Sequence, residues 1–343
     1  MAGFPAGSQA RKNQQTQRKS GLPHGSFLKS DPSGEGWAGL NPLDSTLSPQ
    51  EAGRVVTEMT SAFDRGELDL SDRPTAPIPG WASMPEVAVA VRLRQTGIAP
   101  SQLRCLITFT AAMDRARDAD ALWYSAEKLW INVPWVFDPA TVCTRSFTEL
   151  AEVLSENRVS QRHLQDVAAW RTIAESLADN TVSPDINAAI FDGHGNARRL
   201  LEASQLKALN SGKTSRFPFL AGPKVGPMWI RMLAEPGNAR IDDIHVLPVA
   251  VDVQVRKVTE NLGVTKTAGQ DLERVRTQIQ RGWQEAIDNG TAVGPEQLRG
   301  TAAALDPVLW FWGKWGCSFC ERAKRQIPVH SVCAGCKLRD HTA

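Results

Sequence analysis

The chain has 343 residues, of which 42% are hydrophobic and 22% are charged, and its formal net charge is +2. This composition suffices for the core of one large domain or two closely packed ones, and the nearly balanced charge means that any surface for a polyanion must come from local clusters of basic residues. The sequence has no apolar stretch of transmembrane length, and no apolar block follows the basic residues near its N-terminus, so we expect neither a membrane span nor a secretory signal. A cytoplasmic, monomeric protein is expected.

The first part of the chain is rich in Gly, Ser, Pro, Gln and basic residues and carries few large apolar side chains. Such a composition cannot bury enough apolar surface to offset the entropy of ordering, so residues 1–50 are expected to form a disordered basic tail. A helical pattern begins at Ser48, with Val56 and Met59 on one face, and prolines break the chain after it. Residues 51–84 are therefore expected to form an accessory helix and a linker.

Apolar residues recur three or four positions apart through much of the following region, which indicates helices. They are expected over 87–96, 101–116, 118–129, 147–154 and 160–178. Ser160 is a candidate N-cap for the last of them. Strand-like alternation is scarce, and the one β-branched run, 245–258, indicates a loop that enters a helix. The sequence therefore predicts a mainly α fold, with the principal domain over 85–310.

A Gly-Pro-Lys turn at 222–224 comes immediately before an amphipathic helix. Such a turn leaves backbone N–H groups unpaired, and these groups, together with the positive end of the helix dipole, suit a phosphate oxygen. Close approach of a DNA backbone also favours glycine at the turn. We therefore expect Gly222, Val225 and Gly226 to contact DNA, although Gly-Pro turns also precede many helices that bind nothing.

A single carboxylate, Asp252, lies within a run of valines and other apolar residues. A half-buried aspartate in these surroundings is costly unless it caps a helix, pairs with a cation or takes part in chemistry. Asp252 would begin the helix that carries Val255, Val258 and Leu262, which makes it a natural N-cap. The residues alone leave the three roles open.

The segments 217–233 and 247–263, in this order, resemble the helix-hairpin-helix (HhH-GPD) DNA glycosylases, which include endonuclease III, the adenine glycosylase MutY and eukaryotic 8-oxoguanine glycosylase. Family members typically read Leu-Pro-Gly-Val-Gly-x-Lys-x-Ala and then Val-Asp-x-His-Val-x-Arg-Val. On this pattern Gly222 matches the second hairpin glycine, Lys224 the nucleophilic lysine of the bifunctional members, and Asp252 their essential aspartate. The resemblance spans roughly residues 85–337 and implies a two-lobed helical fold.

The chain departs from the family pattern at several positions. Leu220 stands where the first hairpin glycine belongs, Gln254 replaces the usual histidine, and the spacer between Lys224 and Asp252 is longer. Upstream, the dipeptide at 113–114 occupies the place where many members carry a Gln that probes the opposing strand.

The resemblance implies base excision from double-stranded DNA. A base that leaves deoxyribose leaves positive charge on the sugar, which Asp252 can stabilise, and a neutral Lys224 amine can attack C1′ to form a Schiff base that leads to β-elimination. The target base must first leave the stack. Two alternatives stay open: a monofunctional glycosylase in which Asp252 activates water, and a non-catalytic DNA-binding protein of the same fold. The base, whether oxidised, alkylated, deaminated or a deliberate modification in foreign DNA, also stays open.

Four of the six cysteines, Cys317, Cys320, Cys333 and Cys336, form two Cys-x2-Cys pairs near the C-terminus. In a reducing compartment such thiols are typical metal ligands, so residues 311–343 are expected to form a four-cysteine metal-binding loop. The spacing favours zinc, whereas the position after a Trp-rich helix resembles the 4Fe-4S loop of endonuclease III.

A basic cluster lies between the inner cysteines. Arg322, Lys324 and Arg325 form the densest such patch after the tail, and we expect it to contact the phosphates of double-stranded DNA. A solvated charged face is the simpler alternative. In a bacterium, a protein with this partner would be associated with the nucleoid.

Overall fold

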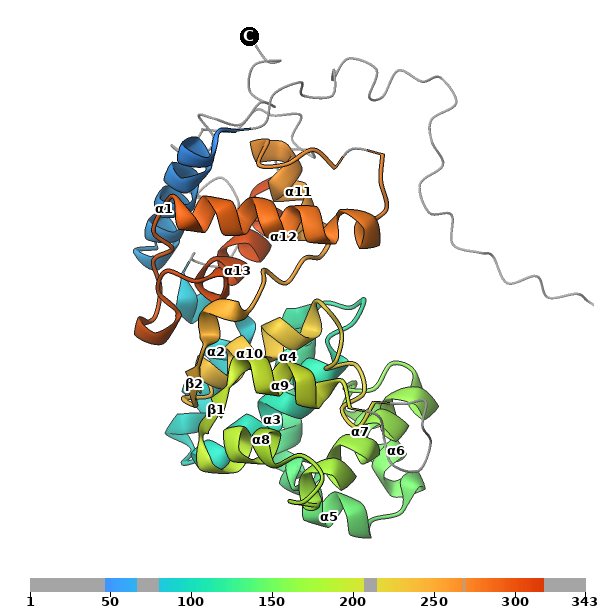
Figure 1. Cartoon of the computed structure of the whole chain (residues 1–343). Coiled ribbons are helices and arrows are strands. Elements are labelled where there is room, and N and C mark those ends of the chain that lie inside the picture. The colour runs from blue at the N-terminus through green and yellow to red at the C-terminus, as the bar shows by residue number, and fades with distance from the viewer. Residues whose placement is uncertain (1–46, 67–79, 207–214, 268, 318–343) are drawn as a thin grey trace, which may run out of the picture. The chain divides into compact units, whose positions relative to one another are not determined.

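The computed structural model describes residues 47–66, 80–206, 215–267 and 269–317 (Figure 1). Within these residues the chain forms thirteen α-helices, several short 3-10 or π-helical turns (η) and one two-stranded sheet, which confirms the mainly α class. In chain order the elements are α1 (Pro49–Asp64), η1 (Trp81–Ser83), α2 (Pro85–Gln95), α3 (Pro100–Met113), α4 (Ala119–Asn132), η2 (Pro134–Phe137), α5 (Pro139–Thr144), α6 (Phe147–Glu156), α7 (His163–Ala178), α8 (Pro184–Asn187), η3 (Ala188–Asp192), β1 (His194–Asn196), α9 (Ala197–Ser204), α10 (Val225–Ala234), β2 (Arg240–Asp242), η4 (Ile244–Val246), α11 (Val253–Leu262), α12 (Leu272–Asp288), η5 (Glu296–Leu298), α13 (Ala302–Phe311) and η6 (Trp312–Cys317).

Helix α1 belongs to the core and is not an accessory element. It starts directly after Ser48, which exchanges hydrogen bonds with Glu51 in a capping box. Phe63 in its last turn is fully buried, and the helix packs along α12. The approach is so close that a Cβ on Gly53 would lie 2.3 Å from the carbonyl oxygen of Asn289. The helix therefore begins before the expected tail boundary at residue 50 and packs into the domain that was expected to start at residue 85.

The start of α7 differs from the sequence expectation because a different residue supplies the cap. The Asp166 carboxylate accepts hydrogen bonds from the backbone N–H groups of Gln161 and Arg162, both at 2.8 Å. Ser160 donates its hydroxyl to the same carboxylate at 3.4 Å and does not cap the helix itself. The helix therefore begins at His163, three residues later than expected.

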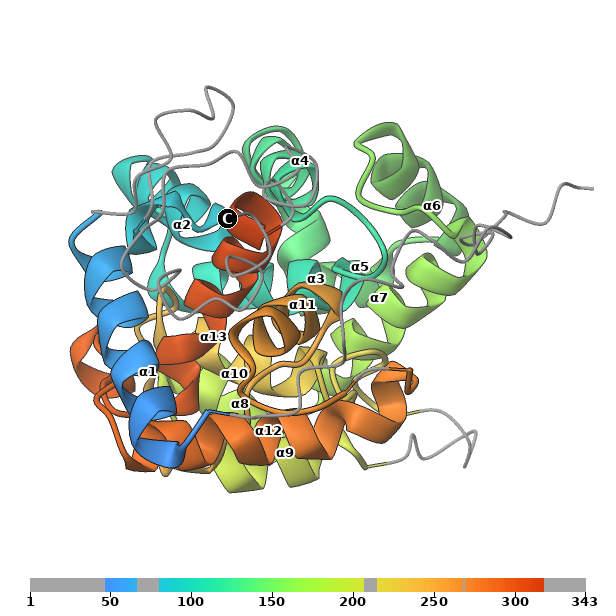
Figure 2. The ribbon, with the colours of Figure 1, turned by 90° about the horizontal axis from the view of Figure 1, so that it is seen from above.

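Helix α13 lies at the centre of the helices that frame the site described below. It contacts α1, α10, α11 and α12, and in Figure 2 it has α1 on one side and α11 on the other. Almost all of its residues are buried, because its sequence is apolar on every face. The turn η6 continues α13 and packs against α11.

The sheet is small: β1 and β2 are three-residue strands that pair in parallel, with His194 opposite Arg240. A buried arginine of α3 supports the neighbouring turn, since Arg104 Nε donates to the carbonyl oxygen of Ile190 at 2.7 Å.

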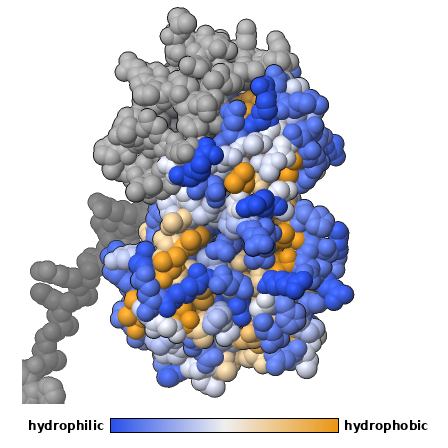
Figure 3. Space-filling model, turned by 90° about the vertical axis from the view of Figure 1, so that its left-hand side faces the viewer, coloured by the Kyte–Doolittle hydropathy of each residue, from blue (hydrophilic) through white to orange (hydrophobic). Residues whose placement is uncertain are grey.

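The surface drawn in Figure 3 mixes hydrophobic patches with hydrophilic side chains. Among the described helices, none combines the length and the apolar character that crossing a membrane requires.

Candidate active site

The turn that leads into α10 presents Lys224 at the N-terminus of the helix. Phe219 makes the sharp bend of this turn in a left-handed conformation, with φ of 71°. The guanidinium of Arg115 lies 3.2 Å from the centre of the Phe219 ring and holds it by a cation–π contact. Leu220, which replaces the first glycine of the family pattern, is fully buried. The bend thus moves one residue upstream, so the turn does not need a glycine at position 220.

The two glycines of the turn have different roles. A Cβ on Gly226 would lie 2.9 Å from the carbonyl oxygen of Leu220, and the Gly226 N–H donates to the carbonyl oxygen of Gly222 at 2.9 Å. Gly226 is therefore required for packing, and its amide is engaged instead of being unpaired as the sequence suggested. At Gly222 the nearest described atom to a Cβ would be 3.6 Å away, which leaves room for an approaching ligand. The side chain of Val225 is buried.

Asp252 uses its two carboxylate oxygens for two different partners. Its Oδ1 accepts hydrogen bonds from the backbone N–H groups of Gln254 at 2.8 Å and Val255 at 3.0 Å, which makes it the N-cap of α11. Its Oδ2 lies 3.6 Å from Nζ of Lys224. The capping role and the pairing with a cation, which the sequence left as alternatives, are both present. Lys224 and Asp252, which are 28 positions apart, meet as the resemblance implied.

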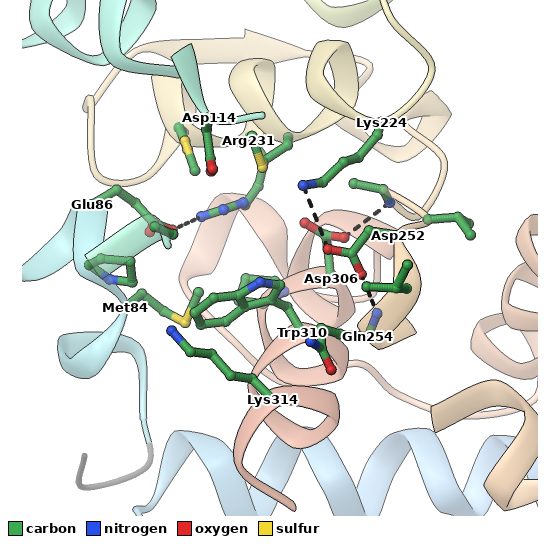
Figure 4. A pocket seen from close by; sticks show the side chains of 18 of the residues that line it. Met84, Glu86, Asp114, Lys224, Arg231, Asp252, Gln254, Asp306, Trp310 and Lys314 are labelled. Atoms are coloured by element: carbon green, nitrogen blue, oxygen red, sulfur yellow. Dashed lines mark hydrogen bonds and ion pairs between the residues drawn. The ribbon is translucent and has the colours of Figure 1, made fainter. Parts of the chain in front are cut away.

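The Lys224–Asp252 pair lines a cavity of about 530 Å³ (Figure 4). This volume falls within the range of roughly 300 to 1,000 Å³ that is usual for small-molecule sites, so a nucleobase fits. Part of the wall is apolar and comes from Met84, Met228, Met232 and Trp310. The two paired side chains keep access to the cavity, with exposed fractions of 29% for Lys224 and 16% for Asp252.

A second ion pair closes the cavity on the side of α2. Arg231 Nη1 donates to Glu86 Oε1 at 2.7 Å, and both side chains are almost completely buried (Figure 4). Breaking a buried pair leaves an uncompensated charge, so this pair constrains how α10 sits against α2. It lies next to Asp114, a buried carboxyl of the same cavity.

A further carboxyl, Asp306 of α13, is wholly buried near the Lys224–Asp252 pair (Figure 4). It accepts a hydrogen bond at 3.0 Å from the backbone N–H of Ala250, two residues before Asp252. Burial raises the pKa of Asp306 to about 6, against the opposing effect of Arg231. Asp306 therefore fixes the strand-like approach to α11 and adds negative potential beside the site.

The cysteine segment is described only at its beginning. Cys317 is buried at the end of η6, while Cys320, Cys333 and Cys336 lie outside the described residues, as do Arg322, Lys324 and Arg325. The turn η6 is in direct contact with the first turn of α11, because a Cβ on Gly313 would lie 2.6 Å from the carbonyl oxygen of Gln254. The first cysteine is thus anchored against the helix that Asp252 caps.

The sequence interpretation missed Glu86, Asp114, Arg231 and Asp306. Asp306 carried the same signal as Asp252, a lone carboxylate in an apolar run, Ala-Ala-Ala-Leu-Asp-Pro-Val-Leu. Glu86 and Arg231 gave no comparable signal, since each occurs in an ordinary amphipathic pattern and their pairing joins residues 145 positions apart.

No protein-family model matches the chain, and searches of curated proteins and of solved structures found no match either. The functional argument therefore depends on the site itself.

Proposed function

We propose that the chain is a DNA glycosylase of the two-lobed helix-hairpin-helix type with AP-lyase activity. A damaged or modified base of double-stranded DNA is flipped into the cavity beside Lys224 and Asp252 and excised there. The observation that carries this proposal is the 3.6 Å distance between Lys224 Nζ and Asp252 Oδ2 at the wall of a cavity of about 530 Å³.

The chemistry uses both members of the pair. The glycosidic C1′–N bond breaks, its electron pair leaves with the base, and the base takes up a proton. Lys224 Nζ gives up a proton and forms a bond to C1′, and opening of the sugar ring yields a Schiff base. Asp252 supports both steps, because its carboxylate stabilises positive charge on the sugar and lies close enough to Nζ to accept a proton.

The surroundings suit a flipped base. Methionine and tryptophan side chains supply apolar surface for the faces of a base. Gly222 leaves room at the start of α10, where backbone N–H groups and the helix dipole favour a phosphate.

The four cysteines complete the proposal. Cys317, Cys320, Cys333 and Cys336 would hold one metal centre, either a 4Fe-4S cluster or zinc, and the donor set of four thiolates fits both. The buried position of Cys317 against α11 suits a structural centre. Together with Arg322, Lys324 and Arg325, the loop would contact the phosphates beside the excised base.

A base-release screen tests the activity. Duplexes that each carry one oxidised, deaminated or alkylated base are incubated with the protein, and released bases are identified by mass spectrometry. We expect release of at least one base, abolished by Asp252→Asn and unaffected by Asp242→Asn, an exposed aspartate outside the cavity. DNA binding without release of any base would instead support a non-catalytic DNA-binding protein.

A further inference from the structure

Asp114 is a buried carboxyl for which the chain provides no partner. It follows the last residue of α3, is 9% exposed and lines the cavity of Lys224 and Asp252. In Figure 4 its carboxyl points toward the interior of the site, beside Arg231. None of the described residues forms a hydrogen bond or an ion pair with this carboxyl, in contrast to Glu86, Asp252 and Asp306.

The environment of Asp114 favours its neutral form. Burial raises its pKa above the usual range, and the carboxylates of Glu86 and Asp252 act in the same direction, whereas Lys224 and Arg117 oppose them. A neutral carboxyl carries an O–H donor as well as an acceptor oxygen. That O–H requires an acceptor, which the ligand has to bring.

Other lining residues present donors in the same condition. Trp123 Nε1 and Arg231 Nε are buried without a hydrogen-bond partner among the described atoms. Buried donors are normally satisfied, and an unsatisfied one at a functional site calls for an explanation. The polar groups that this cavity leaves unpaired are therefore mostly donors.

We infer that Asp114 and Trp123 determine which base the cavity accepts, by donating hydrogen bonds to acceptor atoms on the edge of the flipped base. This inference rests on the proposed glycosylase function and narrows its substrate class. The preferred base carries carbonyl oxygens on its buried edge, as oxidised and deaminated bases do. A cationic alkylated base, which would call for an ionised Asp114, is disfavoured.

The test separates recognition of the base from binding of the DNA. Four duplexes serve as probes, containing a tetrahydrofuran abasic analogue, 8-oxoguanine, hypoxanthine or 7-methylguanine. Dissociation constants and base-release rates are measured for the wild type, Asp114→Leu, Asp114→Asn and Trp123→Phe. The tetrahydrofuran duplex has no base to read, so it reports only on contacts to the DNA backbone.

We expect the wild type to prefer at least one carbonyl-bearing duplex over the abasic analogue. Asp114→Leu should reduce that preference about tenfold or more, the effect of losing one or two buried hydrogen bonds, and leave the affinity for the tetrahydrofuran duplex unchanged. Asp114→Asn keeps a donor and an acceptor and should retain most of the preference. Trp123→Phe keeps the ring but loses the N–H, so a smaller loss is expected. The melting temperature of both Asp114 variants should not fall, because an unpartnered buried carboxyl is removed.

Two outcomes would overturn the inference alone: normal binding of the tetrahydrofuran duplex with unchanged base preference in Asp114→Leu, or a preference for 7-methylguanine that Asp114→Asn abolishes. Absence of binding to every duplex by the wild type would instead refute the proposed function, and the inference with it.

Discussion

Oδ2 of Asp252 lies 3.6 Å from Nζ of Lys224, while Oδ1 of the same carboxylate caps α11. The hydrogen bonds to the cap fix the orientation of the carboxylate, so its second oxygen remains directed at the lysine without a flexible search. Local helix stability and the geometry of the site thus depend on the same side chain.

The proposed nucleophile can be identified by covalent trapping. Borohydride added during reaction with a substrate duplex should reduce the Schiff base and leave a stable protein–DNA adduct. Lys224→Gln should abolish the adduct, because an amide cannot form a Schiff base, and should retain binding of an abasic-analogue duplex. Gel electrophoresis under denaturing conditions measures the adduct.

Lys314 provides the matched control, since it also lines the cavity but pairs with Asp118 at 3.5 Å. Lys314→Gln should still be trapped. If trapping persists in Lys224→Gln and disappears in Lys314→Gln, the nucleophile is misassigned. Base release by the wild type without any adduct would favour the monofunctional mechanism, in which Asp252 activates water.

Substitutions of Asp252 separate its two roles. Asp252→Asn keeps an oxygen that accepts from the Gln254 and Val255 N–H groups, so the melting temperature should stay close to that of the wild type. Base release should nevertheless fall by orders of magnitude, because the amide carries no negative charge. Asp252→Ala loses the cap as well and should cost about 1 kcal/mol of stability in addition. Equal activity of Asp252→Asn and the wild type would refute the electrostatic role.

The sequence predicted the helical class and the pair at the centre of the site for local reasons. Apolar periodicity located most helices, and Asp252 could be recognised as an N-cap because capping depends on residues next to it in the chain. The start of α7 was wrong by three residues because Asp166, inside the first turn, competes with Ser160 as the cap. Such a choice depends on local geometry that periodicity does not report.

The remaining parts of the site depend on contacts between distant segments. The role of Asp306 follows from its bond to Ala250, 56 positions away, and the pairing of Glu86 with Arg231 is longer still. The compensation at Leu220 was equally hidden, since it requires Arg115 to stack on Phe219. A single sequence carries no signal for these pairings beyond the types of residue that could form them.

Asp306 should make stability depend on pH. Its pKa rises from 3.8 to about 6 on folding, so the folded state holds the proton more tightly and stability decreases as the pH rises from about 4 through 6. The shift corresponds to about 3 kcal/mol. Asp306→Asn cannot titrate, so its stability relative to the wild type should grow by about that amount between pH 4 and pH 7. Urea unfolding at a series of pH values measures this difference, and a difference that stays constant with pH would contradict the assignment.

Gly313 should be indispensable where η6 meets α11. Gly313→Ala forces a Cβ to within 2.6 Å of the Gln254 carbonyl oxygen, so we expect a loss of roughly 1 to 3 kcal/mol and displacement of the first turn of α11. Base release should fall further than stability alone explains, because Asp252 caps that turn. Gly316→Ala is the control, since its Cβ would meet only the Trp312 side chain, at 3.1 Å. Similar effects of the two substitutions on activity would argue against the coupling.

The four cysteines should bind one metal centre per chain. Anaerobic purification followed by elemental analysis should find either iron with acid-labile sulfide or a single zinc ion, and serine substitution of Cys317, Cys320, Cys333 or Cys336 should lower the metal content. Cys143→Ser, at a half-exposed position in α5, should leave it unchanged. Removal of the metal by a chelator should lower the melting temperature, because ligand binding to the folded state stabilises it. It should also weaken DNA binding more than it slows base release at saturating protein, since the loop contributes phosphate contacts and no group that reacts. Wild-type protein that contains neither metal and keeps its stability in chelator would remove the metal centre from the proposal and leave the Lys224–Asp252 chemistry untouched.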